Sequence, residues 1–110
     1  QPNISQLYAT MHHYYVYILR CADGSYYTGV TNNIERRFKE HETGRNETCY
    51  TFKRRPLSLV YTRHFQYILD AIAFEKQVKG WSRKKKEALI NGDFEKLSLL
   101  SRNYTQYGKP

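Results

Sequence analysis

The sequence predicts an α+β fold in which a small three-stranded antiparallel sheet is flanked by helices. Runs rich in β-branched and aromatic residues occupy the first two thirds of the chain, and helical patterns dominate the rest. The first two runs are separated by an Asp-Gly turn signal, which is typical of a hairpin. The predicted element order is therefore ββαβααα, a small antiparallel sheet with helices packed on it.

Three segments have the composition of strands. Residues 14–21 (YYVYILRC) and 26–31 (YYTGVT) lie on either side of Asp23-Gly24 and form the predicted hairpin. Residues 57–65 (LSLVYTRHF) form the third predicted strand.

Start and stop signals predict the helices. Asn32 or Asn33 caps a helix over 34–43, and Gly44 ends it. A polar, basic loop (RNETCYTFKRRP) follows this helix. Three further helices are predicted over 67–79 before Gly80, over 83–91 after Ser82, and over 94–100 after Asp93.

The chain of 110 residues fits a single domain, predicted over 14–101. Residues 1–13 are expected to be a disordered N-terminal extension or a cloning remnant, and 102–110 a loose polar tail. No apolar run approaches the roughly 18 residues of a membrane span. No basic segment followed by an apolar stretch, as in a signal peptide, begins the sequence. We therefore expect a cytoplasmic protein with no membrane partner.

The composition is basic and rich in tyrosine. Lys and Arg number 18 against 10 Asp and Glu, which gives a formal net charge of +8 and a pI near 9.6. Such a domain attracts polyanions, of which nucleic acid is the commonest, although general electrostatic stickiness or solubility would explain the same charge. The 11 tyrosines suit base stacking, phosphate contacts or core filling, and composition does not choose among them.

The two cysteines, Cys21 and Cys49, lack CxxC spacing, and the four histidines complete no zinc pattern. A chain large enough for its own core does not need a disulfide. We predict free thiols in a reducing compartment.

Glu75 falls near the middle of an apolar stripe on the helix predicted over 67–79. A buried carboxylate is costly unless it is paired or holds a metal ion. The pattern leaves both interpretations open: a metal ligand, or a core Glu bridged to an Arg or Lys.

Arg37 and His41 lie four residues apart, so they share one helix face. Together they could clamp a phosphate and tune a proton, although a solvated charged face is the more frequent explanation. Gly29 interrupts a strand of large residues, which often marks a bulge or a close backbone approach to a ligand. Tyr17 and Tyr27 are candidates to point into the same space, and each alone also suits a core position.

These positions resemble the paired tripeptides of the GIY-YIG nuclease family. Tyr15-Val16-Tyr17 stands ten residues before Tyr27-Thr28-Gly29, with Tyr15 and Val16 in place of the Gly and Ile of the family name. The similarity spans roughly residues 14–100 and is greatest to small stand-alone bacterial proteins akin to the N-terminal nuclease domain of the excision-repair incision subunit. It continues, in order, through Thr31-Asn32-Asn33-Ile34, Arg37, His41, Gly44, Tyr50-Thr51, Arg55-Pro56-Leu57, Leu59-Val60-Tyr61, Glu75 and Trp81.

The resemblance implies a metal-dependent phosphodiesterase that cuts DNA and leaves 3′-hydroxyl and 5′-phosphate ends. It implies that Glu75 holds one Mg²⁺ or Mn²⁺, whose remaining ligands are waters and the phosphate. Arg37 would neutralise charge on the phosphate. No match is found to the Asn that some members place after the Glu.

The same resemblance implies that Tyr17 takes the proton of the attacking water. A free tyrosine has a pKa of about 10, so positive charge from Arg37, the metal or a protonated His41 would have to favour the phenolate. Tyr27 would hydrogen-bond the nucleophile or the phosphate, and Gly29 would allow a close backbone approach.

A shared site also constrains the hairpin. With a two-residue turn at Asp23-Gly24, Tyr17 and Tyr27 would face opposite sides of the sheet. We therefore predict a loop of three or five residues, or a bulge.

Two basic segments are candidates for contacts with the DNA backbone, which position DNA without reading its sequence. Each of these residues could equally belong to a solvated cationic face. The expected partner is DNA, bound by a monomer without sequence preference, and the alternative function is a catalytically weak or inactive nucleic-acid-binding module on the same fold. The candidate residues are Lys53, Arg54, Arg55, Arg83, Lys84, Lys85 and Lys86.

Overall fold

A computed structural model describes residues 12–103 and confirms the predicted α+β fold and element order. The sequence patterns did not indicate a short 3₁₀ turn that lies in the basic loop. The elements are β1 (Tyr14–Arg20), β2 (Tyr26–Thr31), α2 (Ile34–Thr43), η1 (Phe52–Arg54), β3 (Ser58–Phe65), α3 (Ile68–Lys79), α4 (Arg83–Ile90) and α5 (Phe94–Asn103).

The sheet is antiparallel with the strand order β2-β1-β3, so the first strand lies in the centre. In the hairpin, Tyr17 pairs with Gly29 and Leu19 pairs with Tyr27. Arg20 and Tyr26 form the last pair, which leaves a five-residue loop between the strands. The predicted odd-length loop is confirmed, and it places Tyr17 and Tyr27 on the same face of the sheet.

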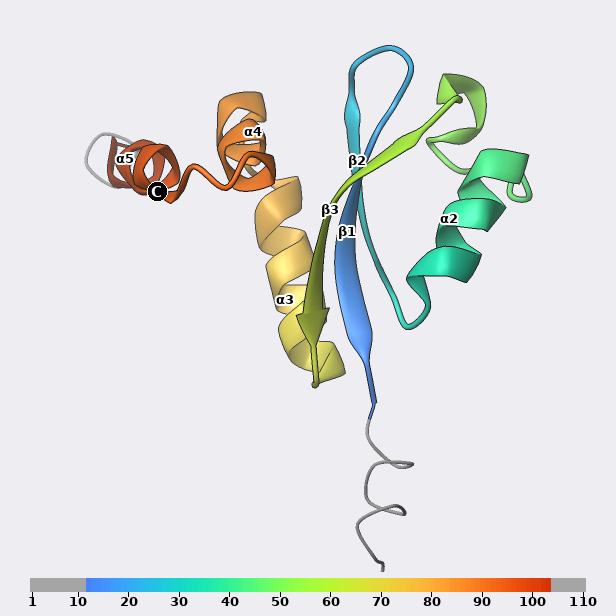
Figure 1. The fold of residues 1–110 in the computed structure, drawn as a ribbon, viewed down its shortest axis with the longest axis horizontal. Coiled ribbons are helices and arrows are strands. Elements are labelled where there is room, and N and C mark those ends of the chain that lie inside the picture. Colours follow the sequence, from blue (N-terminus) through green and yellow to red (C-terminus); the bar gives the residue numbers. More distant parts are fainter. Residues whose placement is uncertain (1–11, 104–110) are drawn as a thin grey trace, which may run out of the picture. The chain divides into compact units, whose positions relative to one another are not determined.

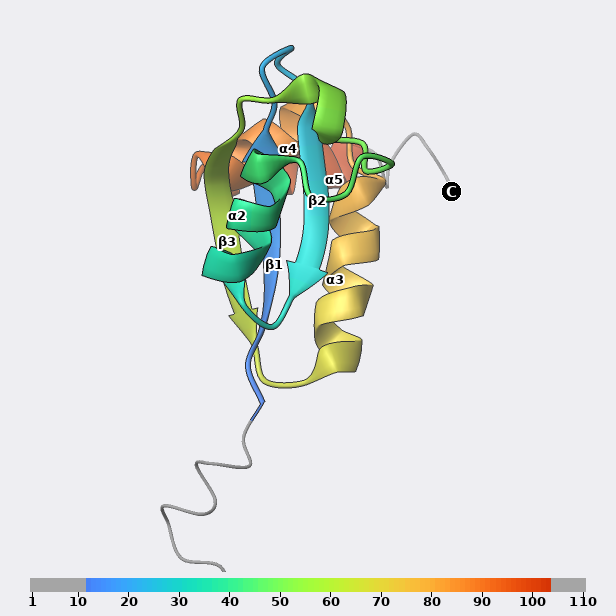
Figure 2. The ribbon, with the colours of Figure 1, turned by 90° about the vertical axis from the view of Figure 1, so that its right-hand side faces the viewer.

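Helices cover the sheet on both faces: α2 lies on one side and α3 on the other (Figures 1 and 2). Tyr17 and Leu19 pack with Ile34 and Phe38, which identifies their face as the one under α2. Because side chains alternate along a strand, the fully buried Val16 and its neighbours on the opposite face lie against α3.

The ends of α2 follow the predicted signals. The side chain of Asn33 accepts a hydrogen bond from the backbone N–H of Arg36, as an N-cap does. Gly44 ends the helix in the left-handed conformation, with φ of 69°, which a residue with a Cβ rarely adopts. These caps fix the length of α2 and therefore the position of the functional side chains that it carries.

One compact unit ends at Lys79, and a second, with α4 and α5, begins at Gly80. The prediction of a single domain over 14–101 stays a prediction. In the second unit Ser82 caps α4 as expected, and α5 continues through Asn103, beyond the predicted start of the tail. None of the helices within 12–103 is long and apolar enough to cross a membrane.

At the N-terminal side, His12 and His13 belong to the described part of the chain. Nδ1 of His13 lies 2.8 Å from Nε2 of His64, on β3. The rest of the predicted N-terminal extension, residues 1–11, and the C-terminal residues 104–110 lie outside the described residues.

Candidate active site

Tyr17 lies at the centre of the face under α2, and Gly29 makes room for its ring. Tyr17 is 2% exposed and pairs directly with Gly29 across the hairpin. A Cβ on Gly29 would lie 2.5 Å from Oη of Tyr17 and 2.6 Å from its Cζ. The ring of Tyr17 therefore fills the space beside Gly29, and the β1–β2 pairing runs without a bulge. The expected close approach of a ligand to the Gly29 backbone stays a prediction.

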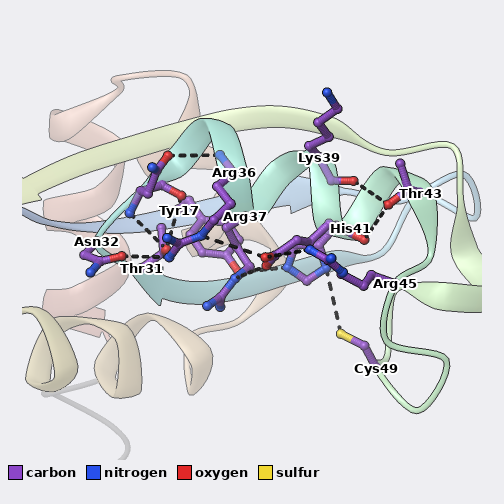
Figure 3. A network of polar contacts seen from close by, with 12 residues as sticks. Tyr17, Thr31, Asn32, Arg36, Arg37, Lys39, His41, Thr43, Arg45 and Cys49 are labelled. Atoms are coloured by element: carbon purple, nitrogen blue, oxygen red, sulfur yellow. Dashed lines mark hydrogen bonds and ion pairs between the residues drawn. The ribbon is translucent and has the colours of Figure 1, made fainter.

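The hydroxyl of Tyr17 meets the imidazole of His41 from α2. Oη of Tyr17 lies 2.9 Å from Nε2 of His41, and the His41 side chain is itself buried. Figure 3 shows Tyr17, Arg37 and His41 converging from β1 and α2. The structure thus brings together the tyrosine, the arginine and the histidine that the sequence singled out.

The other ring nitrogen of His41 meets two residues that were not among the predicted site residues. Nδ1 lies 2.8 Å from Oγ1 of Thr51, and Sγ of Cys49 lies 3.8 Å from the same nitrogen. Thr51 is only 1% exposed, and its hydroxyl donates to Sγ of Cys49 at 3.4 Å. Both residues come from the loop after α2, in which the resemblance at Tyr50-Thr51 was the signal that included Thr51.

The protonation states differ from the expectation. Burial raises the pKa of Tyr17, and Tyr27 raises it further, while Arg37 lowers it without overcoming burial. Burial also lowers the pKa of His41, and the charge of Arg37 adds to this effect. The expectation that a protonated His41 favours a phenolate is therefore wrong: at neutral pH a neutral imidazole faces a protonated Tyr17.

Arg37 lies beside this pair and is held by an acidic neighbour. Its Nε donates to Oε1 of Glu40 at 3.0 Å, and its positive charge lowers the pKa of the Tyr17 hydroxyl. Arg36 and Arg45 share the other carboxylate oxygen of Glu40 at 3.8 and 3.7 Å. Three guanidinium groups around one carboxylate leave an excess of positive charge, which suits a phosphate.

Tyr27 lines the same space but is turned toward the loop. Its ring lies edge-on to His41, with centroids 5.2 Å apart, and stacks on Tyr50 at 6.2 Å. Burial raises the pKa of its hydroxyl, and the neighbouring Cys49 raises it further. Tyr27 would have to exchange Cys49 for a substrate group in order to take its predicted role.

A cavity of about 430 Å³ opens beside these side chains. Its wall carries two arginines, Arg37 and Arg45, and its other lining residues include Tyr27 and Cys49. Tyr17 does not line the cavity. The lining residues are Tyr27, Arg37, Glu40, His41, Gly44, Arg45, Asn46, Cys49, Thr51 and Phe52.

Glu75 comes from α3, on the other side of the sheet. It is 8% exposed, and its Oε2 lies 2.6 Å from Nζ of Lys79, one turn along the helix. Its negative charge contributes to the raised pKa of Tyr27. Tyr27 lies on β2, which is an edge strand of the sheet. Within 12–103 no three His, Cys, Asp or Glu side chains are grouped for a metal, and the expected role of Glu75 as a metal ligand stays a prediction.

The predicted DNA contacts of the loop are partly engaged inside the protein. Nε of Arg54 lies 3.2 Å from Oδ2 of Asp23, and its guanidinium stacks on Tyr50. The guanidinium of Arg55 donates to the backbone carbonyls of Phe52 and Glu42. Both arginines therefore brace the loop that carries Thr51, whereas Lys53 is exposed.

The basic helix α4 is described by itself, as part of the second unit. Arg83 pairs with Glu87 at 3.1 Å, and Nζ of Lys85 lies 4.4 Å from the centroid of the Trp81 ring. Partial burial lowers the pKa of Lys85 and of Lys86. Lys84 is exposed and accessible to a phosphate.

Comparison with known proteins adds to this geometry. The family profile described as GIY-YIG catalytic domain matches residues 13–88. A UPF0213 protein of Halalkalibacterium halodurans is 44% identical over 91 residues, which cover 80% of this chain and 96% of that protein. One of Natronomonas pharaonis is 46% identical over 77 residues, covering 70% and 89%. The solution NMR structure of EF2693 from E. faecalis is similar over 74% of this chain and 86% of that one, with a TM-score of 0.54 and 35% identity.

Proposed function

Because the chain belongs to the GIY-YIG family, we propose that it is a metal-dependent DNA endonuclease that hydrolyses phosphodiester bonds in repair or recombination. The observation that carries the proposal is the contact between the hydroxyl of Tyr17 and Nε2 of a buried, neutral His41. His41 and Arg37 line the same cavity, where positive charge would stabilise the charge that develops on a phosphate during hydrolysis.

Tyr17 and His41 act as one proton-accepting unit. A tyrosine whose pKa is raised by burial is a poor base on its own. When its hydroxyl oxygen takes a proton from the attacking water, its own proton passes to Nε2 of His41 along the existing 2.9 Å contact. The water oxygen bonds to phosphorus, and the bond from phosphorus to O3′ breaks. O3′ leaves with the electron pair and takes a proton from solvent to become the 3′-hydroxyl, and no free phenolate is needed before the reaction.

Arg37 and Glu75 supply the electrostatic part of the site. Arg37 neutralises the charge that builds on the phosphate. Glu75 is a nearly buried carboxylate whose ammonium partner, Lys79, is half exposed and free to turn away, so its oxygens fit a hard cation such as Mg²⁺ or Mn²⁺. When bound, such an ion would stabilise the leaving oxygen.

The second candidate function is a nucleic-acid-binding module with little or no catalysis. The ion pair between Glu75 and Lys79 favours it, because this pair satisfies the carboxylate without a metal. A binding module needs the basic surface but not the contact between Tyr17 and His41.

Cleavage of a DNA panel separates the two functions. Single-stranded, duplex, flap and branched DNA are incubated with Mg²⁺ or Mn²⁺, with an EDTA lane and the variants Glu75→Gln and Tyr17→Phe. The nuclease is expected to cut in the metal lanes alone and to lose at least about 100-fold in rate in both variants. Salt-sensitive binding by all three proteins without cutting would support the binding module instead.

A further inference from the structure

We propose that Thr51 is a positioning residue: with its hydroxyl proton directed to Cys49, it holds His41 in the tautomer that carries its proton on Nδ1. Nε2 is then free to accept the proton of Tyr17. This inference rests on the proposed function and identifies the part of the fold that prepares His41 for its role.

The first argument comes from the Thr51 side of the ring. A hydroxyl has one proton to donate and two lone pairs that accept. Oγ1 of Thr51 donates its proton to Sγ of Cys49 at 3.4 Å, so its lone pairs face Nδ1 of His41 at 2.8 Å. Nδ1 must then carry the proton of that hydrogen bond.

The sulfur is a good acceptor for this proton. Burial raises the pKa of the Cys49 thiol, but hydrogen bonds outweigh burial and lower it. The groups that lower this pKa are the hydroxyl and backbone of Thr51, the hydroxyl of Tyr27 and the backbone of Tyr50. The 3.4 Å contact with the sulfur therefore gives the Thr51 proton an acceptor other than His41.

The second argument comes from the Tyr17 side and leads to the same tautomer. The guanidinium of Arg37, which has donors and no acceptor, lowers the pKa of the Tyr17 hydroxyl and offers no lone pair to the Tyr17 proton. Tyr17 therefore has to direct its own proton elsewhere, and Nε2 of His41 lies 2.9 Å away. An Nε2 that accepts from Tyr17 is unprotonated, so both ends of the chain of contacts place the proton on Nδ1.

Burial makes the choice of tautomer effective. Thr51, His41 and Tyr17 are all under one tenth exposed, so water does not readily replace a missing partner. Loss of the Thr51 acceptor would leave Nδ1–H unpaired and favour the other tautomer, in which Nε2–H opposes the proton of Tyr17. Proton transfer from Tyr17 would then be blocked.

The experiment measures the tautomer directly. Long-range ¹H–¹⁵N NMR on protein with ¹⁵N-labelled histidine at pH 7.5 reports which nitrogen of His41 is protonated. We compare the unchanged chain with Thr51→Val, which removes the hydroxyl, and Thr51→Ser, which keeps it. Thr48→Val is the matched control, because Thr48 is an exposed threonine of the same loop whose hydroxyl contacts Asn46.

The unchanged chain, Thr51→Ser and Thr48→Val are expected to show Nδ1–H, and Thr51→Val a shift toward Nε2–H. Single-turnover cleavage is expected to fall at least about tenfold in Thr51→Val and to stay within about threefold of the unchanged rate in the other two. Nδ1–H in Thr51→Val, or equal losses in Thr51→Ser and Thr51→Val, would overturn the inference.

A second variant keeps the test decisive if Thr51→Val does not fold. Cys49→Ala removes the acceptor of the Thr51 proton and should raise the fraction of Nε2–H, whereas an unchanged Nδ1–H signal would contradict the inference. The tautomer is read without DNA or metal, so this result is independent of the proposed function. An unchanged chain that shows Nδ1–H but does not cut DNA would overturn the nuclease and leave the positioning role of Thr51 intact.

Discussion

The two regions that supply the candidate site are built in different ways. On the face under α2, Tyr17, His41 and Thr51 are almost completely buried and joined by contacts of 2.9 and 2.8 Å. On the α3 side, Glu75 has one ion-pair partner, Lys79, whose side chain is 53% exposed. The first region is held by buried hydrogen bonds, and the second by an ion pair with a half-exposed side chain.

This difference indicates a division of labour. Proton transfer is sensitive to small changes in the distance between donor and acceptor, and a packed hydrogen-bond chain keeps that distance fixed. Charge neutralisation tolerates a looser arrangement, because substrate and cation complete it. We therefore expect substitutions on the α2 face to act through geometry, and substitutions near Glu75 to act through charge.

The largest expected effect tests the electrostatic contribution on the α2 face. Arg37→Ala should lower the single-turnover cleavage rate about 100-fold, because a positioned donor to the phosphate is lost. Arg36→Ala is the matched control, since Arg36 is the adjacent arginine and pairs with the same Glu40 at 3.8 Å. Equal losses in the two variants would show that general positive charge, rather than the position of Arg37, matters.

Gly29→Ala tests how rigid the α2 face is. The new methyl group would meet the ring of Tyr17 at 2.5–2.6 Å, so we expect a loss of about 1–3 kcal/mol in the free energy of unfolding. Urea denaturation followed by circular dichroism measures this loss. A change below about 0.5 kcal/mol would mean that Tyr17 moves aside without cost, against the fixed geometry described above.

Lys79→Met tests the opposite property on the α3 side. Although the lysine is half exposed, its removal leaves the nearly buried Glu75 carboxylate unpaired and should cost about 1–3 kcal/mol without metal. The unpaired carboxylate should then bind Mg²⁺ more tightly, so Mg²⁺ should raise the Tm of this variant more than that of the unchanged chain. Glu75→Gln should abolish the Mg²⁺ response, and a response that survives in Glu75→Gln would place the cation elsewhere.

The smallest expected effect is a pH dependence of stability that comes from His41. Burial lowers its pKa below the ordinary 6.5, so the unfolded chain binds a proton at a higher pH than the folded chain. Stability is therefore complete above about pH 6.5 and falls as the pH drops through the folded pKa. Urea midpoints between pH 5 and 8 should show this slope, and His41→Gln should flatten it; an equal slope in the variant would exclude His41 as its source.

Local signals in the sequence account for most of the fold. The caps Asn33 and Gly44 bound α2 as predicted, and the requirement that Tyr17 and Tyr27 share a face predicted the parity of the hairpin loop. The ion pair between Glu75 and Lys79 was one of the two interpretations that the pattern left open, and it has the ordinary spacing of a helical pair.

The rest of the site depends on tertiary structure. Thr51 reaches His41 because the loop after α2 folds back onto the helix. A single threonine in a loop belongs to no helical or strand periodicity that would predict this contact. The raised pKa of Tyr17 reflects a balance between burial and the charge of Arg37, and the degree of burial is not readable from residue types alone. The same holds for Arg54, which was a candidate DNA contact. The residue types do not show that the fold brings Asp23 and Tyr50 next to its guanidinium.

The central claim is that Tyr17 and His41 form one proton-accepting unit, and a double-mutant cycle tests it most directly. Single-turnover cleavage at saturating Mg²⁺ is measured for the unchanged chain, Tyr17→Phe, His41→Gln and the double variant. The account predicts that each single change costs about 100-fold and that the double variant is no slower than the worse single variant. Losses that multiply, to about 10,000-fold in the double variant, would mean that the two residues act independently and would contradict the account.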